Sequence, residues 1–322
     1  MSDVRGSMVA GPLRNISILY KNSRYIAEEV FQSILCSPES RLTVYNRGDF
    51  FRDDMKLRAP GTKPFRITVG SSTVDISMQQ WAINTSVPDE DRRDALFTNS
   101  PPLQPDIDAL ILLTDRLLLK KEKLVSDAVV GATTVWAGET GGEDCNSLWA
   151  AGDNNTFIED VHAAIDSMIR ETGFRPNRMI FSFNTWNQLQ QESSVLNRIR
   201  STTTGIVTEE LIKEIFKLDK VFVATSIVNT ATEGTTDAMT GQYLFDQSGT
   251  GSAFLYYYGP KGLKKPNAGY ICTLINTGVN RVSYKFRDEE CLTDVYTIKE
   301  DFAVATNFAP YLGKLFMNTI NT

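Results

Sequence analysis

Residues 41–82 contain two strand-like segments with a long polar connection, and this arrangement constrains the fold more than any other part of the sequence. The first segment, RLTVYNR, begins at Arg41, and the second, FRITVGSSTVDISM, begins at Phe65. Both are rich in β-branched residues that partly alternate with polar ones, which predicts two strands of an extended hairpin. An isolated hairpin buries too little apolar surface to be stable in water, so we expect a partner to cover it.

The composition is that of a folded protein and argues against several functions. The chain has 322 residues, of which 42% are hydrophobic and 22% charged, as in ordinary globular domains. Its net charge of -6 does not suit a protein that grips nucleic acid through many phosphate contacts. The N-terminus lacks the pattern of a secretory signal, and no apolar run reaches the roughly 18 residues of a membrane helix. We therefore expect no membrane partner.

Residues that could carry catalysis or bind a metal are few and scattered. His162 is the single histidine, and the cysteines lie far apart, at Cys36, Cys145, Cys272 and Cys291. A zinc site needs such ligands at close spacing, so we expect reduced, mostly buried thiols and a structural histidine. No glycine-rich phosphate loop or serine nucleophile elbow occurs. We predict no catalytic residue, cofactor or metal; the carboxylates of Asp49–Asp54 leave a carboxylate-dependent hydrolase as an alternative.

The segment Asp106–Val130 has the clearest helical pattern. Its apolar residues recur at spacings of three and four and mark one buried face: Ile107, Leu110, Leu117, Leu118, Leu124, Val125 and Ala128. Lys120, Lys121 and Lys123 lie on the opposite face, which we interpret as solvated, with a DNA contact as the alternative. The preceding residues 87–105 are charged and proline-rich, and we expect a flexible hinge there.

The remaining segments predict a mixed architecture. Residues 156–174 form an amphipathic helix in which Thr156 and Glu159 have capping-box spacing and Gly173 the place of a left-handed C-terminal residue. Helical and strand-like segments then alternate as far as Thr306, which predicts an α+β fold. Residues 1–38 are expected to form an arm that needs a partner for its order, and residues 230–242 a long polar loop.

Several segments, in this order, resemble the major capsid protein of tailed bacteriophages, in the branch with Gly-Asp-Phe-Phe-Arg in its early hairpin. The segments are VYNRGDFFRDDMKLRAPGT, VPDEDRRDA, LLLKKEKLVSDAV, TGFRPNRMIFSFNTWNQLQ and IRSTTTGIVTEELIKEIFKLDKVFVATSIVNTATEG. The similarity extends from Tyr20 to Leu312. It implies the Hong Kong 97-type capsid fold, which has an N-terminal arm, an extended E-loop hairpin, a long spine helix, a P-domain and an A-domain.

The resemblance implies a division of the chain into five segments. Residues 1–38 would be the N-terminal arm, 39–105 the E-loop hairpin and hinge, and 106–154 the P-domain with the spine helix. Residues 155–278 would be the A-domain, and 279–322 the P-domain strands and C-terminus. The three residues that crosslink subunits covalently in the founding member of the family cannot be identified here, so crosslinking is not predicted.

The same resemblance implies a structural protein that binds copies of itself. Hexamers and pentamers would build an icosahedral virion capsid, assembled in the bacterial host cytoplasm, around double-stranded DNA that is bound without sequence specificity. A portal protein, and scaffolding, decoration or auxiliary proteins, would be further partners. An encapsulin-like protein compartment, which shares the fold, is the alternative.

The resemblance also implies two sets of contact residues. The E-loop would contact a neighbouring subunit through Arg47, Asp49, Phe50, Phe51, Arg52, Asp53 and Arg58. The loop at the capsomer axis would contribute Thr232, Glu233, Thr236 and Asp237. On this interpretation the tripeptide Arg47-Gly48-Asp49 belongs to a shell contact and is not a receptor-binding tag.

Overall fold

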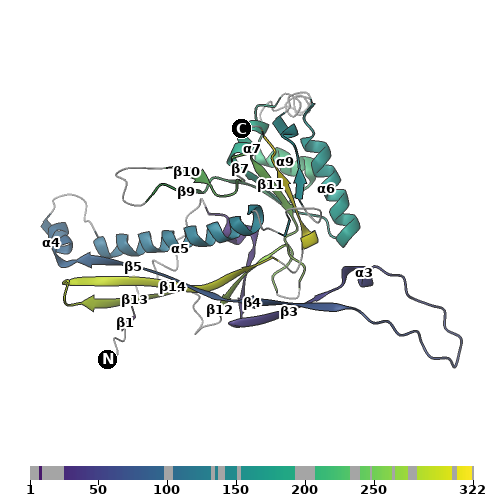
Figure 1. Cartoon of the computed structure of the whole chain (residues 1–322), viewed down its shortest axis with the longest axis horizontal. Helices are drawn as coiled ribbons and strands as arrows, with labels where there is room; N and C mark the ends of the chain where they lie inside the picture. The colour runs from purple at the N-terminus through teal and green to yellow at the C-terminus, as the bar shows by residue number, and fades with distance from the viewer. Residues whose placement is uncertain are drawn as a thin grey trace.

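The computed structural model describes residues 7–8, 25–97, 104–131, 135–136, 142–150, 154–192, 207–232, 240–246, 249–262, 265–274, 281–306 and 310–320. Two sheets form the body of the molecule, and a long helix lies along one of them (Figure 1). A hairpin with an extended loop projects from one end of the body (Figure 1). The predicted mixture of helices and sheets is therefore confirmed.

The larger sheet has six strands and supports the long helix. Its order is β1 (Ser7–Met8), β13 (Arg281–Asp288), β14 (Thr293–Ala305), β12 (Tyr270–Leu274) and β2 (Gln32–Cys36), with β5 (Gln79–Pro88) also paired to β14. Helix α5 (Pro105–Val130) packs on β5 and β14, where Leu110 and Leu117 contact Tyr296 and Ile298. The predicted helix is confirmed to within one residue.

The smaller sheet has five strands and lies under a cover of helices. Its order is β6 (Gly142–Asp144), β15 (Gly313–Met317), β11 (Ser252–Tyr256), β7 (Arg178–Ser182) and β8 (Lys220–Ala224). The helices that pack against it are α6 (Phe157–Thr172), α7 (Phe183–Leu189) and α9 (Glu209–Phe216). Every residue of β7 and β11 is buried, which explains why their sequences are continuous apolar runs without alternation.

Short elements connect and extend these layers. They are α2 (Ala27–Val30), the antiparallel hairpin β3 (Glu39–Tyr45) and β4 (Ser71–Ser77), α3 (Arg47–Phe50), α4 (Asp89–Phe97), the hairpin β9 (Ile227–Asn229) and β10 (Gly241–Tyr243), and the 3-10 turns Leu148–Ala150 and Pro310–Leu312. Leu42 of β3 and Ile76 of β4 are buried against Ile34 and Tyr270. The base of the β3–β4 hairpin is thus covered by its own chain at these two residues, while most other residues of both strands and of the distal loop are exposed.

Helix α6 confirms one predicted terminus and corrects the other. Gly173 follows the helix with φ of 72°, and its amide donates to the carbonyl of Ile169, as expected of a left-handed C-cap. The capping box is wrong, because Thr156 donates to the Asp160 carboxylate and makes no capping bond to the backbone. Asn155 caps the helix in its place, accepting from the amide of Phe157 at 2.9 Å.

The prediction of an arm for residues 1–38 is wrong for its last third. Helix α2 buries Ala27 and Val30 in the core beside Val125 and Val129. Strand β2 pairs in parallel with β12 along its full length. The hydrogen bonds from β12 hold β2 in place within its own chain. The sequence pattern could not predict this pairing, because β12 lies more than 200 positions away in the chain.

The predicted hinge at 87–105 is also wrong in its first half. Strand β5 continues through it to Pro88, and Asp89 then begins the helix α4. An ion-pair network at Asp89 and Arg92 holds this helix to the strands and to the start of α5. The density of charged residues predicted a flexible, solvated hinge, but residues on α5 and the strands neutralise the charges of Asp89 and Arg92.

The solvated interpretation of the lysines on α5 fails for one of the three. Lys123 is exposed, but Lys121 is 3% exposed and its Nζ lies 2.5 Å from Oε1 of Glu300 on β14. Lys120 lies over the ring of Trp81, 4.3 Å from its centre. The strands beneath the helix provide partners for Lys120 and Lys121, so the positions of these two side chains are explained without a DNA contact.

Each of the two sheets takes strands from more than one of the predicted segments. Strands β6 and β15 fall outside the segment 155–278, yet they pair at the edge of the sheet that this segment builds. Strand β12 falls inside that segment, yet it pairs with β14 and β2 in the larger sheet. The chain therefore crosses between the two layers more often than its linear order indicates.

Candidate intersubunit surface

The extended loop is closed at its neck by hydrogen bonds from its own residues. The amide of Asn46 donates to the carbonyl of Gly70 at 2.8 Å, and the amide of Gly70 donates to Oδ2 of Asp49 at 2.9 Å. The side chain of Asn46 lies against Gly70 so closely that a Cβ there would overlap it. The Asp49 carboxylate also faces Arg52, at 3.9 Å. Asp49 therefore has a structural role at the neck of the loop.

Phe51 contacts its own chain on one face of its ring. A Cβ at Gly173, the C-cap of α6, would lie 3.3 Å from ring atoms Cε1 and Cζ of Phe51. The ring remains 62% exposed on its other side. Phe51 thus braces the root of the loop against α6, while its free face stays available to a second molecule.

Beyond the neck, the loop exposes large apolar side chains. Met55 is 96% exposed and Leu57 is fully exposed, and a row of others follows on the return: Phe65, Ile67 and Val69. Soluble monomers seldom display a contiguous apolar segment of this kind, and such segments mark interaction sites. The only ring contact described within the loop is Lys56 over Phe65, at 4.6 Å. The loop is therefore a candidate interaction surface.

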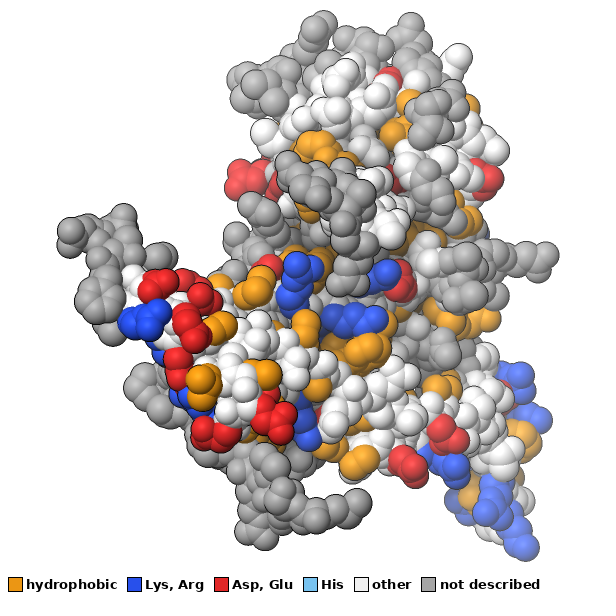
Figure 2. Space-filling model, turned by 60° about the vertical axis from the view of Figure 1, so that its left-hand side comes forward, with side chains coloured by type: hydrophobic (Ala, Val, Ile, Leu, Met, Phe, Trp, Pro, Cys, Tyr) orange, Lys and Arg blue, Asp and Glu red, His pale blue; other side chains and the backbone are white. Residues whose placement is uncertain are grey.

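Charge divides the loop into two parts. Near the neck, Asp53 and Asp54 accompany Arg52. From Met55 to Gly70 the loop has four basic residues and no acidic one: Lys56, Arg58, Lys63 and Arg66. All four are exposed. Figure 2 shows basic side chains gathered at this end of the molecule and acidic ones at the other.

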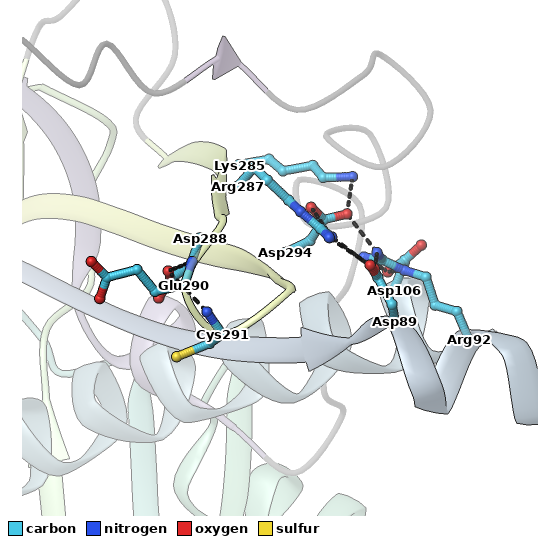
Figure 3. A network of polar contacts seen from close by, with 9 residues as sticks. All are labelled: Asp89, Arg92, Asp106, Lys285, Arg287, Asp288, Glu290, Cys291 and Asp294. Carbon is cyan, nitrogen blue, oxygen red and sulfur yellow. Dashed lines mark hydrogen bonds and ion pairs between the residues drawn. The ribbon is translucent and has the colours of Figure 1, made fainter.

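The opposite end of the molecule contains a network of ion pairs (Figure 3). Arg92 of α4 binds Asp106 at 2.7 Å and Asp294 at 2.6 Å, and Arg287 of β13 binds Asp89 at 2.5 Å. Lys285 adds a contact to Asp294 at 2.8 Å. These pairs fasten α4 to β13, β14 and the first turn of α5.

The network shifts the pKa of its members in the directions expected of paired charges. A hydrogen bond from Arg287 holds the pKa of Asp89 below its usual value. Burial alone would raise the pKa of Asp294, but Lys285 and Arg92 together bring it below its usual value. Burial likewise opposes the charge of Arg92, whose pKa is nevertheless raised by Asp106 and Asp294. The pairing thus favours the charged forms of Asp89, Asp294 and Arg92.

The predicted residues are distributed unevenly over the structure. Asp49, Phe51, Arg52, Asp53 and Arg58 lie on the loop or its neck, whereas the side chains of Arg47 and Phe50 lie outside the described part. Thr232 is exposed near the β9–β10 hairpin. Glu233, Thr236 and Asp237 lie outside the described residues. Of this loop, the prediction included Arg58 but missed Met55, Lys56, Leu57, Lys63 and Arg66, although a run without acids was visible in the sequence.

Other functional chemistry finds little support in the described part of the chain. Cys36, Cys145 and Cys272 are buried and Cys291 is exposed, and all four are free thiols. His162 is exposed on α6, with its ring 5.3 Å from that of Phe216. Among the described residues, no cluster of three or more acidic, histidine or cysteine side chains could hold a metal ion. No described helix is long and apolar enough to span a bilayer.

Comparison with known sequences identifies similar proteins from two phages. The chain is 23% identical over 220 residues to the major capsid protein of Burkholderia phage BcepMu, covering 67% of this chain and 68% of that protein. It is 24% identical over 225 residues to the major capsid protein of Pseudomonas phage JBD67, covering 69% and 70%. No family model matches the chain.

Comparison with solved structures extends the likeness to nearly the whole chain. A phage-related protein from Bordetella bronchiseptica RB50 matches with a TM-score of 0.74 and 18% identity, over 98% of this chain and 99% of that one. The capsid structure of cyanophage P-SCSP1u matches with a TM-score of 0.58 and 9% identity, over 98% and 90%. At such low identity these matches establish the fold, and the predicted fold class is confirmed.

Proposed function

We infer that this chain is a tailed-phage major capsid protein with the Hong Kong 97-type fold, a structural protein that assembles with copies of itself into the shell of a virion. The observation that carries the inference is the match of its fold, over 98% of its length, to a phage capsid subunit. Similarity to two phage major capsid proteins supports the same function. Neither alternative is favoured, since Asp49 is committed to the loop neck and the similar sequences come from phages.

The extended loop is the part that reaches a neighbouring subunit. Met55 and Leu57 are almost fully exposed, so burying them against another copy removes apolar surface from water at roughly 25 cal/mol per Å². Arg52, Asp53 and Arg58 would then set the register of the contact, because charges between identical surfaces contribute more to orientation than to affinity. Phe51 supports this contact from the root of the loop.

The shell would consist of hexamers and pentamers held by many modest contacts. A standard interface buries roughly 800 Å² per partner, and a closed shell multiplies such contacts until loss of one subunit becomes rare. Individually weak contacts also allow misplaced subunits to leave before the shell closes. Thr232 and the polar loop that follows it would lie near the capsomer axis, in an A-domain that includes the smaller sheet.

The remaining partners follow from the same function. The net charge of -6 suits a container that encloses double-stranded DNA without gripping its phosphates. A portal protein would occupy one vertex, and scaffolding or decoration proteins would act during or after assembly. Assembly would take place in the cytoplasm of the bacterial host.

Electron microscopy of the purified chain tests this function. Expressed alone or with the other head genes of its phage, the protein should form closed particles of uniform size. Replacing Met55 and Leu57 with serine should leave the subunit folded, because both side chains are exposed, but should prevent closure. Ile215→Ser, on an exposed position of α9, is the matched control and should assemble normally. Absence of closed particles from the unmodified chain in both settings would refute the function.

A further inference from the structure

A buried carboxylate on α5 joins three parts of the chain that are far apart in the sequence. Glu122 is 0% exposed, and its oxygens accept hydrogen bonds from residues 25–30, hereafter the α2 segment, and from Ser226 between β8 and β9. We propose that Glu122 is a proton-dependent latch, which holds the α2 segment closed against α5 while the carboxyl group is protonated and favours opening of the segment once the proton is lost. The latch belongs to the single subunit and does not depend on contacts between copies.

The two oxygens of Glu122 have different partners. Oε2 accepts from the amides of Ile26 and Ala27, at 3.0 and 2.7 Å. Oε1 lies 3.1 Å from the amide of Ile26 and 3.2 Å from Oγ of Ser226. Both amides belong to the N-terminus of α2, where backbone donors have no partner within the helix. The carboxyl group therefore satisfies buried donors that would otherwise be left unpaired.

This arrangement accommodates the protonated carboxyl group. An amide can only donate, so the oxygen that faces both amides, Oε2, is a poor place for the proton. Oε1 faces the hydroxyl of Ser226, which can accept as well as donate. With the proton on Oε1, Glu122 donates to Ser226 and still accepts from both amides through Oε2. Loss of the proton instead leaves a negative charge without contact to water, which is costly unless a cation pairs with it.

The lysine next to Glu122 in the sequence does not pair with it. Lys121 binds Glu300 at 2.5 Å and lies 3.7 Å from Glu28 of the α2 segment. Arg281 is a second cation on Glu300, at 3.3 Å. Among the described residues, no cation forms an ion pair with Glu122. A charge on its carboxylate therefore stays uncompensated.

Charged residues on the other neighbouring elements also pair with one another. Glu29 of the α2 segment binds Arg178 of β7 at 3.2 Å and Lys220 of β8 at 3.0 Å. Strands β9 and β10 contain no charged residue. Burial is thus the largest influence on Glu122 and raises its pKa to about 7, although the hydrogen bonds from its three donor groups act in the opposite direction.

Opening of the latch would loosen two elements from α5 together. Glu122 binds both the α2 segment and Ser226, whose carbonyl accepts from the amide of Leu244 at 3.0 Å. One turn along α5, Ser126 donates to the carbonyl of Leu244. The latch lies where α5 passes between the larger sheet and the β9–β10 hairpin (Figure 1). Loss of the proton therefore weakens the hold of α5 on the α2 segment and on the β8–β9 connection at once.

Other contacts keep the open form in the minority. Ala27 and Val30 of the α2 segment are buried in the same cluster as Val125 of α5. The hydroxyl of Tyr25 donates to Oδ2 of Asp115 at 3.4 Å. These contacts do not involve Glu122, so the proton changes how often the segment opens without unfolding the subunit.

The size of the effect follows from the difference in pKa between the two forms. In the closed form the pKa of Glu122 is about 7, whereas in the open form the carboxyl group meets water and returns to about 4.5. Between these values the open form loses its proton first, so the open fraction rises with pH. Raising the pH from about 5.5 to about 7.5 should increase the open fraction on the order of tenfold.

Hydrogen exchange of the full chain tests the latch. Exchange is measured by mass spectrometry on the unassembled subunit at pH 5.5 and at pH 7.5, on peptides that cover residues 25–31. Protection is expressed relative to an unstructured peptide at the same pH, which removes the intrinsic pH dependence of exchange. In the unmodified chain, protection of the α2 segment should fall on the order of tenfold as the pH rises. Protection of α6 should not change over this range.

Two variants assign the effect to Glu122. Glu122→Gln is neutral at both pH values; its amide oxygen can accept from the two backbone amides and its NH2 group can donate to Ser226, so the segment should stay protected throughout. Glu28→Gln is the matched control, because Glu28 lies in the same segment but is 53% exposed and contacts Lys121 instead. It should show the same fall in protection as the unmodified chain. Circular dichroism establishes that each variant is folded.

Each outcome supports or overturns the latch. Equal protection of the α2 segment at the two pH values, an undiminished fall in Glu122→Gln, or loss of the fall in Glu28→Gln would overturn it. If Glu122→Gln does not fold, the unmodified chain decides: an equal fall in the α2 segment and in α6 would mean a general loosening and would also overturn the latch. None of these measurements requires closed particles, so the latch and the proposed function can fail separately.

Discussion

The buried ion pair between α5 and the larger sheet gives the sharpest test of how this fold is held together. Lys121 is 3% exposed and Glu300 is 2% exposed, with Nζ and Oε1 2.5 Å apart. Arg281 of β13 contacts the second oxygen of Glu300 at 3.3 Å, and Glu28 of α2 lies 3.7 Å from Lys121. One pair of charges therefore joins four elements, and its removal should loosen the long helix from the sheet.

Lys121→Met should destabilise the subunit by about 3 kcal/mol. Breaking a buried ion pair by removing one partner costs about 3–5 kcal/mol, because the other charge stays buried without compensation. We expect the lower end of this range, since Arg281 still contacts Glu300.

Urea unfolding of the unassembled subunit measures these costs, with the Met55→Ser, Leu57→Ser chain as the background that prevents shell formation. Lys123→Met is the matched control: Lys123 lies on the same helix but is exposed, so its change should stay within about 0.5 kcal/mol. If Lys121→Met proved as mild as Lys123→Met, the reasoning from burial and pairing would be refuted.

Three further predictions concern other polar and strained positions. Burial raises the pKa of Glu122 to about 7, so the folded state keeps a proton that the unfolded state loses above about pH 4.5. The stability that this group contributes should therefore fall as pH rises from about 4.5 to about 7. In urea unfolding, the free energy of unfolding of Glu122→Gln should depend less on pH than that of the unmodified chain. Gly173→Ala should lower the free energy of unfolding by about 1–2 kcal/mol in thermal or urea unfolding, because the φ of residue 173 is 72°. Adding Phe51→Ala removes the ring that the new Cβ would contact and should restore only the part of the loss that this contact causes. Full restoration of stability would contradict the argument from backbone conformation. Asp49→Ala should accelerate hydrogen exchange at the Gly70 amide, whereas Asp49→Asn, which keeps an acceptor oxygen, should change it little; equal rates in both would contradict the role at the neck.

Local pattern predicted the elements that satisfy their own backbone and have a one-sided apolar face. Helix α5 was placed to within one residue, because Leu110, Leu117 and Val125 repeat at the helical period. Gly173 was recognised as a C-cap because only a residue that tolerates positive φ fits there. The capping box at Thr156 failed because Asn155 offered a competing acceptor to the same helix terminus.

The candidate surface was predicted in part. The extended loop was expected to lack support, and the structure leaves Met55 and Leu57 exposed. Its internal contacts were not expected, because Asp49–Gly70 and Phe51–Gly173 join residues 21 and more positions apart. The contact between α4 and the β13–β14 turn was missed for a similar reason: Asp89 and Leu292 come together only through the pairing of β5 with β14.

The sequence by itself determined the helical and extended segments, the α+β class and the presence of a ribbon with little cover of its own, because those depend on periodicity and on contacts between near neighbours. Only the tertiary structure decided which charges are neutralised and which remain free. Lys121 and Arg92 have partners contributed by strands more than 170 positions away in the chain, and no local pattern records them. Coulomb energy depends on separation in space and on burial, and both are properties of the folded chain.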